Sequence, residues 1–320
     1  MIHSVRVLLF ILLLSSPLAA QEEDRLPRFS TRVEQVVVYV SVYDQNSALV
    51  SGLPQEDFAL YEDGIEQELT SFAQSDVPST IGLVIDTSGS MRSKMRDVEK
   101  AVGLFLDQSN PQNQLFFIRF DDEVELEEGF TYEVEDIRDA LANVIVKGGT
   151  ALFDAIYLGV DHAQDGDEPK KVVVVFTDGE DKDSYYTHDE LLAQVREMDT
   201  QIFVIAFLDE TLSNGKGFFG IFKSEREKVQ EQISAVAEVT GGQAFFPDDV
   251  DQLSPVFEAI AHELKNQYRL AYISSNPRRD GSWREIEVKV REAREKGYRV
   301  RARKGYYTPT ETTSSASESR

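Results

Sequence analysis

Residues 172–176, four valines followed by a phenylalanine, form the segment that most restricts the fold of this chain. A strand that is apolar at every position, rather than at alternate positions, is buried on both faces of its sheet. Further strand-like segments lie at 81–85, 114–120 and 202–207. Stretches with helical periodicity separate them, and parallel strands are usually joined by helices. The sequence therefore predicts an α/β fold with a doubly wound, mostly parallel sheet.

The helical segments are recognised from apolar residues that recur every three or four positions. Met95, Val98, Val102 and Leu106 show this spacing, which places them on one face of a helix. Comparable patterns predict helices at about 95–106, 137–144, 152–162, 189–198, 227–239 and 255–265.

Both ends of the chain read instead as short strands joined by turns, at 36–43, 58–62 and 67–72 and again at 268–273, 284–290 and 298–303. Each set alone is too small to be stable. We therefore expect both sets to form one antiparallel accessory sheet that flanks the α/β domain. The predicted organisation is a β unit at 21–78, the α/β domain at 79–265, further strands at 266–309 and a disordered tail at 310–320, which is rich in Ser, Thr and Glu.

Residues 1–20 match a secretory signal peptide. Arg6 precedes an apolar stretch at 7–14 that is too short to span a bilayer well, and small residues lead to Ala20, after which we expect cleavage. An uncleaved membrane anchor is the alternative interpretation. No second stretch approaches the length of a membrane span, so we expect no stable membrane insertion after signal removal. The predicted location is periplasmic or extracellular.

The charge and the absence of cysteine exclude several classes of function. The chain of 320 residues has 57 acidic and 33 basic residues and a formal net charge of −24. Such a charge repels nucleic acid and anionic lipid, so neither is an expected partner. Because the chain contains no cysteine, disulfides, thiolate metal sites and a cysteine nucleophile are also excluded.

Oxygen-bearing side chains cluster where two predicted strands end. Asp86, Ser88 and Ser90 follow the strand at 81–85. Thr150 lies at the start of a predicted helix, and Asp178 lies just beyond the strand at 172–176. The first segment alone could be a turn that caps the next helix. If the two strands are neighbours, however, the five side chains converge, and they suit a six-coordinate Mg²⁺ with a position left open; Ca²⁺ or Mn²⁺ would also fit.

At these residues the chain resembles a von Willebrand factor type A domain. That family carries a metal-ion-dependent adhesion site with the pattern Asp-x-Ser-x-Ser followed by a distant Thr and a distant Asp, and all positions match in order. The resemblance covers about residues 79–265. It implies that Ser88, Ser90 and Thr150 bind the ion directly, while Asp86 and Asp178 act directly or through water. Segments at 53–58, 62–64 and 304–307 also resemble exported bacterial proteins described as VWFA-related.

The resemblance implies a secreted, non-catalytic binding or adhesion module. Neutral hydroxyl ligands would leave the ion electrophilic, so a carboxylate of a partner protein could complete its coordination. A structural envelope module in which the metal only rigidifies the loops remains an alternative.

The chain lacks residues that two candidate classes of enzyme require. A magnesium-dependent phosphohydrolase of the haloacid dehalogenase type needs a second acid two positions after Asp86, and that position is Ser88. A serine triad would have to use His162, His188 or His262, and no Gly-x-Ser-x-Gly elbow is present.

Two further segments have simpler interpretations. The glycine-rich stretch at 211–220 is predicted to be a surface loop, because Lys216 is not followed by Ser or Thr as a phosphate loop requires. The acidic run of Glu123, Glu125, Glu127 and Glu128 could hold calcium, but its alternation favours the solvent face of an edge strand.

Overall fold

The computed structural model of the chain describes residues 35–179, 181–208 and 224–310. The predicted signal peptide, the glycine-rich stretch at 211–220 and the predicted tail after Thr310 lie outside the described residues. The boundaries of the four predicted segments remain predictions.

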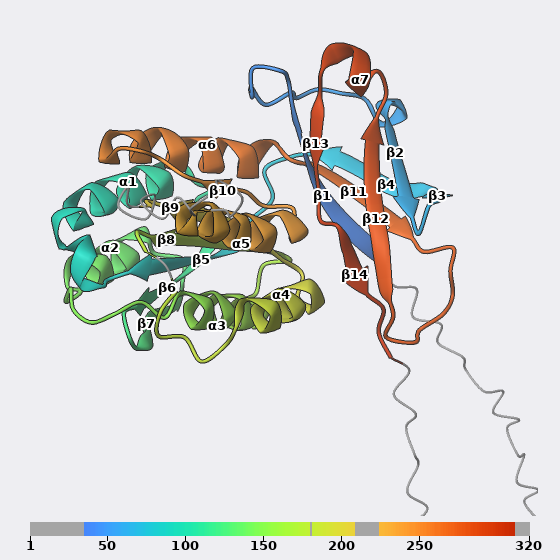
Figure 1. Cartoon of the computed structure of the whole chain (residues 1–320). Coiled ribbons are helices and arrows are strands. Elements are labelled where there is room, and N and C mark those ends of the chain that lie inside the picture. Colours follow the sequence, from blue (N-terminus) through green and yellow to red (C-terminus); the bar gives the residue numbers. More distant parts are fainter. Residues whose placement is uncertain (1–34, 180, 209–223, 311–320) are drawn as a thin grey trace, which may run out of the picture. The chain divides into compact units, whose positions relative to one another are not determined.

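A six-stranded sheet with the strand order β10-β9-β8-β5-β6-β7 lies at the centre of the α/β part (Figure 1). Its strands run parallel except β7, which is antiparallel to β6. β5 and β9 are buried along their whole length, as apolar strands between two helical layers must be. The predicted fold class is confirmed. The strands are β5 (Ser79–Asp86), β6 (Gln114–Phe120), β7 (Val124–Thr131), β8 (Lys170–Thr177), β9 (Thr200–Ala206) and β10 (Ala244–Phe245).

Helices cover both faces of this sheet because alternate strand side chains point to opposite sides. Leu83 of β5 packs into a core with α1, α2 and α6, whereas its neighbour Val84 packs into a second core with α3, α4 and α5. The helices are α1 (Met95–Gln108), α2 (Val134–Ala142), α3 (Leu152–Gln164), α4 (His188–Glu197), α5 (Glu225–Val239) and α6 (Leu253–Asn266). Among the described residues, none of these helices has the length and apolar character needed to cross a membrane.

The acidic run lies on the edge strand β7, as predicted. Two of its carboxylates have a local partner, since Arg119 of β6 forms ion pairs with Glu125 and Glu127. Arg119 is largely buried and also pairs with Asp121 at 3.0 Å. The alternation of acidic residues therefore serves to neutralise a buried guanidinium as well as to face solvent.

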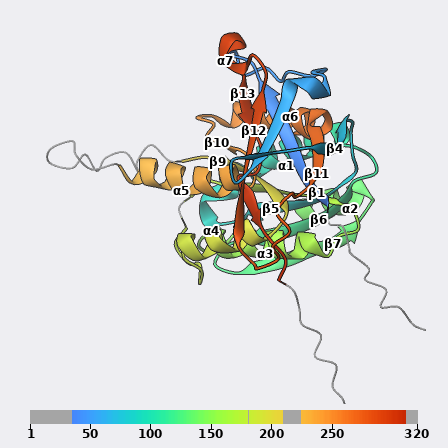
Figure 2. The same ribbon diagram turned by 90° about the vertical axis from the view of Figure 1, so that its right-hand side faces the viewer.

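The terminal strands form two sheets, so the prediction of one accessory sheet is wrong. Their orders are β13-β1-β11-β4 and β14-β12-β2-β3. Each sheet combines strands from both ends of the chain, which appear side by side in blue and red in Figure 2. The strands are β1 (Gln35–Tyr43), β2 (Phe58–Glu62), β3 (Ile65–Gln67), β4 (Leu69–Gln74), β11 (Tyr268–Ile273), β12 (Trp283–Val290), β13 (Arg299–Arg301) and β14 (Gly305–Tyr307).

Two details of the predicted pairing change with this arrangement. The single strand expected at 67–72 is divided at Glu68 into β3 and β4, which belong to different sheets. The three C-terminal strands do not pair with one another, because β11 pairs with β1 and β4 whereas β12 pairs with β2 and β14. Val40 of β1, Leu60 of β2 and Tyr272 of β11 share one buried core. Two sheets packed face to face bury these side chains, which a single exposed sheet could not do.

Candidate metal site

The strand pairing brings the two predicted acidic ligands to one edge of the central sheet. Asp86 is the last residue of β5, and Asp178 directly follows β8. These strands are parallel neighbours, so their carboxyl ends coincide. Asp86 is fully buried, and the side chain of Asp178 is 1% exposed.

Hydrogen bonds connect four of the five predicted ligands into two short chains. Asp178 Oδ1 accepts from the hydroxyl of Ser90 at 2.8 Å, and the hydroxyls of Ser90 and Ser88 lie 3.1 Å apart. Asp86 Oδ1 accepts from the backbone N–H of Ser88 at 2.8 Å, and its Oδ2 accepts from the Thr177 hydroxyl at 2.7 Å. The loop that follows β5 and the loop that follows β8 therefore converge, as predicted.

Helix capping does not explain Ser88. It occupies the N-cap position of the short 3-10 helix η2 (Gly89–Ser93), yet its side chain makes no capping hydrogen bond. Its hydroxyl faces the hydroxyl of Ser90 instead. The alternative interpretation of this segment as a simple capping turn is therefore wrong for the serine side chain.

Thr150 is held beside the Asp178 loop by its main chain. Its N–H donates to the carboxylate of Asp183 at 2.7 Å, and its carbonyl accepts from the N–H of Lys182 at 3.0 Å. The first free N–H groups of α3 are bound by Asp181 and Ser184 rather than by Thr150. The Thr150 hydroxyl is therefore released from capping, and it lies close to Gly179, since a Cβ built there would be 3.7 Å from it.

The loop that carries Thr150 is fixed against the loop that carries the serines. The N–H of Lys147 donates to the carbonyl of Thr87 at 2.9 Å, and the N–H of Gly89 donates to the carbonyl of Gly148 at 3.3 Å. Gly148 has a φ of +72°, and a Cβ at this position would lie 1.9 Å from a carboxylate oxygen of Asp122. Glycine is required here both by the backbone conformation and by this close approach.

The two carboxylates of the site are compensated in different ways. Lys94 forms an ion pair with Asp178 Oδ2. Burial raises the pKa of the Asp86 carboxyl above its ordinary value, although Ser88 and Thr177 donate hydrogen bonds to it. A divalent cation would stabilise the ionised form of this carboxylate.

The donor set fits a hard cation. Two carboxylates and three hydroxyls offer only oxygen, which suits Mg²⁺, Ca²⁺ or Mn²⁺. Within the described ranges, no group of three or more His, Cys, Asp or Glu side chains could hold a metal. A cation at this edge would therefore depend on the hydroxyls, and the residues that would hold it are Asp86, Ser88, Ser90, Thr150 and Asp178.

The sequence of the α/β part identifies the protein family. Residues 80–259 match the von Willebrand factor type A domain. The chain belongs to the von Willebrand factor type A (VWA) family. VWA domains bind a divalent metal at their metal-ion-dependent adhesion site. No curated protein sequence matches the chain.

Several solved structures resemble the VWA chain at low sequence identity. Proximal thread matrix protein 1 from the mussel byssus is 17% identical over 64% of this chain and 51% of its own, with a TM-score of 0.48. The chain thus spans about half the length of that protein. A von Willebrand factor type A protein from Catenulispora acidiphila is 12% identical over 89% of this chain and 76% of its own (TM-score 0.46). An aerotolerance-related membrane protein from Bacteroides fragilis is 17% identical over 58% and 98% (TM-score 0.44).

Three residues of the VWA site were not found from the sequence. Thr177 binds Asp86, Lys94 pairs with Asp178, and Asp183 holds the backbone of Thr150. Lys94 lies between the short helix that contains Ser90 and α1, and its place in the sequence alone does not indicate contact with the site. Thr177 and Asp183 flank Asp178 in the sequence, but polar residues in such loops are too common to be informative.

Replacement of Lys94 by methionine is expected to increase the affinity for Mg²⁺ about tenfold. The Lys94 ammonium neutralises Asp178 and repels a cation placed beside it, and the repulsion between such close charges is worth more than 1 kcal/mol even where water screens it partly. Methionine keeps most of the side-chain length without the charge. Isothermal titration calorimetry with MgCl₂ measures the change.

The matched control is Lys100→Met, at an exposed position of α1, the helix that begins directly after Lys94. It removes the same charge without touching Asp178, so it should leave the affinity within about twofold of the original protein. A loss of affinity in Lys94→Met would contradict this account and would show that Lys94 positions Asp178 for the metal.

Proposed function

We propose that this VWA domain is a non-catalytic module that binds a partner protein through a divalent cation, with Mg²⁺ as the expected ion. The cation would be held by Asp86, Ser88, Ser90, Thr150 and Asp178. The partner would provide a carboxylate that completes the coordination of the ion.

One observation carries this proposal: Ser90 is exposed while the other four residues are buried. Within the described residues, the set of ligands is therefore accessible from the side of Ser90. Three of the five donors are neutral hydroxyls, which leave more positive charge on the ion than carboxylates would. An incoming carboxylate would meet an electrophilic ion at the surface of the protein.

The surroundings of the histidines support a non-catalytic function. The ring of His162 stacks on Phe130 with centroids 4.4 Å apart, and His188 Nε2 lies 3.1 Å from the carbonyl oxygen of Gln232. His262 lies on the exposed side of α6. None of these contacts connects a histidine with Ser88 or Ser90, so they give no support to a serine triad.

A metal that only rigidifies the loops is less consistent with the hydrogen bonding. The loops that carry Ser88 and Thr150 are already joined by direct backbone hydrogen bonds. These hydrogen bonds already restrain the two loops, which leaves less for a purely structural ion to do. An exported protein of this kind would meet its partner in the periplasm or outside the cell, which agrees with the signal peptide expected at residues 1–20.

The test is affinity capture from a bacterial envelope extract on the immobilised protein. We expect at least one partner to be retained in about 5 mM Mg²⁺, a concentration chosen to fill a weak site, and to be released by a chelator. Asp86→Asn should abolish capture, whereas Asp161→Asn, an exposed residue on α3, should not change it.

Binding of an identified partner with the same affinity in Mg²⁺ and in chelator would contradict the proposal. So would phosphate release from p-nitrophenyl phosphate that is lost in Asp86→Asn, because that result would identify an enzyme.

A further inference from the structure

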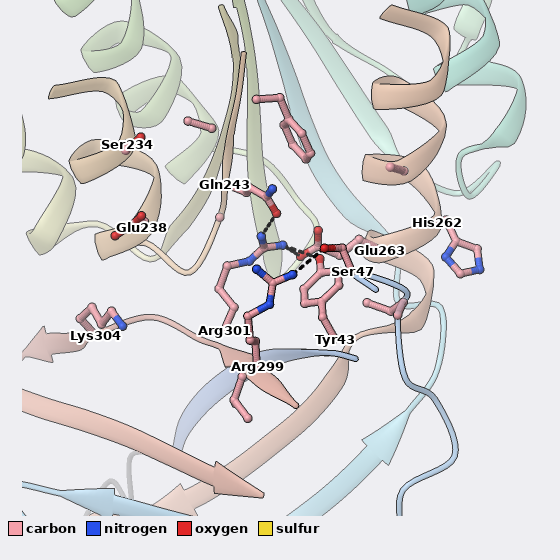
Figure 3. A pocket seen from close by; sticks show the side chains of 16 residues that line it. Tyr43, Ser47, Ser234, Glu238, Gln243, His262, Glu263, Arg299, Arg301 and Lys304 are labelled. Carbon is pink, nitrogen blue, oxygen red and sulfur yellow. Dashed lines mark hydrogen bonds and ion pairs between the residues drawn. The ribbon is translucent and has the colours of Figure 1, made fainter. Parts of the chain in front are cut away.

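A pocket of about 580 Å³ lies between α5, α6 and β13, and it shares no lining residue with the metal site (Figure 3). Pockets of this volume accommodate molecules of metabolite or drug size. Its walls combine apolar and polar side chains. They come from both the VWA domain and the two terminal sheets, which together form a β-sandwich. The lining includes Leu49, Glu238, Phe245, Glu263, Arg299, Val300, Arg301 and Lys304.

The pocket lies where two sheets end. β10 is the last strand of the central sheet and contains only two residues, and β13 is the last strand of its sandwich sheet. Within the described residues, neither strand has a hydrogen-bonded neighbour on its second side. The space between these edges is therefore not filled by a further strand.

One wall of the pocket is fixed by a buried ion pair. Glu263 of α6 is 3% exposed and pairs with Arg301 of β13. The Arg301 guanidinium also donates to the hydroxyl of Tyr43 at 2.7 Å and to the side chain of Gln243. Its Nε is buried and has no hydrogen-bond partner among the described residues. This arginine and this glutamate neutralise each other and hold the wall in place.

Apart from this ion pair, the lining of the pocket carries more positive than negative charge. Arg299 is exposed, and the bond it makes with a side chain is a neutral one to the Ser47 hydroxyl at 2.6 Å. Lys304 is exposed, and within the described part of the chain its ammonium has no hydrogen bond or ion pair. Glu238 of α5 is the remaining acidic residue of the lining. The lining thus has two available basic side chains and one acidic side chain, whereas the whole chain has a net charge of −24.

We infer that this pocket binds a small organic anion. Its carboxylate or phosphate group would interact with Arg299 and Lys304, since guanidinium and ammonium groups form strong charge-assisted hydrogen bonds with oxyanions. Its apolar part would contact Leu49, Phe245 and Val300. The inference does not depend on the metal site.

The probe is 1-anilinonaphthalene-8-sulfonate, which has aromatic rings and one sulfonate and becomes fluorescent in an apolar environment. We expect it to bind the folded protein at a single site. N-phenyl-1-naphthylamine, which has the same rings without the sulfonate, should bind at least about tenfold more weakly because it lacks the charge-assisted contacts. Citrate or glycerol phosphate should displace the probe, and the more effective of the two identifies a carboxylate or a phosphate as the preferred group.

Two kinds of variant test the location. The double variant Arg299→Gln, Lys304→Gln should weaken binding at least about tenfold, whereas Lys289→Gln, Arg294→Gln removes the same charge outside the pocket and should not. Ala259→Trp, which fills the pocket from an exposed position on α6, should block binding without changing the charge. Circular dichroism confirms that each variant is folded. Equal binding by the double variant and its control, or displacement of the probe by neither anion, would overturn the inference.

Discussion

Replacement of Asp86 by asparagine is expected to lower the affinity for divalent cations by at least about 100-fold, since even the hydrogen-bond partners of metal ligands are worth 10- to 100-fold. Asp86 lies at the buried end of β5 and provides one of the two carboxylates at the site. Asparagine keeps the shape of the side chain and one oxygen, which can accept from the N–H of Ser88, and its amide group can donate to the hydroxyl oxygen of Thr177. Calorimetric titration with MgCl₂ or MnCl₂ measures the loss.

The same variant should remain folded. Burial already disfavours the ionised form of Asp86, so an uncharged amide is compatible with its surroundings. In the original protein, a cation at 100 times its Kd should add about 2.7 kcal/mol to the free energy of unfolding, and this gain should disappear in Asp86→Asn. Asp161→Asn is the control and should keep the full gain. An undiminished gain in Asp86→Asn would contradict the assignment of this residue.

Replacement of Glu263 by alanine is expected to lower the free energy of unfolding by about 3–5 kcal/mol, the range found when one partner of a buried ion pair is removed. The carboxylate accepts from the hydroxyl of Ser41 at 2.7 Å and pairs with Arg301. Although burial disfavours the charged guanidinium, Glu263 and Tyr43 hold the pKa of Arg301 above its ordinary value. Without Glu263, the positive charge of Arg301 would lose its compensating partner.

Urea denaturation monitored by circular dichroism measures this cost. Glu263→Gln keeps an acceptor for Ser41 and should be less destabilising than alanine. Glu258→Ala, at an exposed position of the same helix, should change the stability by less than about 0.5 kcal/mol. A cost below about 1 kcal/mol for Glu263→Ala would show that the pair adds little to the packing of α6 against the β-sandwich.

The central sheet and its helices could be predicted because their signals are local. Strands such as β8 are apolar along their length, and α1 carries its buried residues at helical spacing. The five candidate ligands could be selected from the sequence because they lie in short segments at the end of a strand or before a helix. Parallel pairing of β5 with β8 then brings them together, as strand adjacency was expected to do.

The β-sandwich could not be predicted correctly because strand pairing is not a local property. β1 alternates in the same way whether it pairs with β11, as it does, or with its neighbour in the sequence. The pair of Glu263 and Arg301 was missed for a similar reason, since these residues lie on elements that only the tertiary fold brings together. Lys94 was missed because a lysine just before an amphipathic helix is usually a solvated residue.

The central claim is that Asp86, Ser88, Ser90, Thr150 and Asp178 hold one divalent cation. The most direct measurement is anomalous diffraction at the manganese edge from crystals grown in Mn²⁺. The account predicts one anomalous peak at the end of β5 and β8, with the hydroxyl oxygens of Ser88 and Ser90 within about 2.6 Å of the ion, the upper limit for hard cations with oxygen ligands. Absence of a peak at this edge in saturating Mn²⁺, with Lys94 still paired to Asp178, would contradict it.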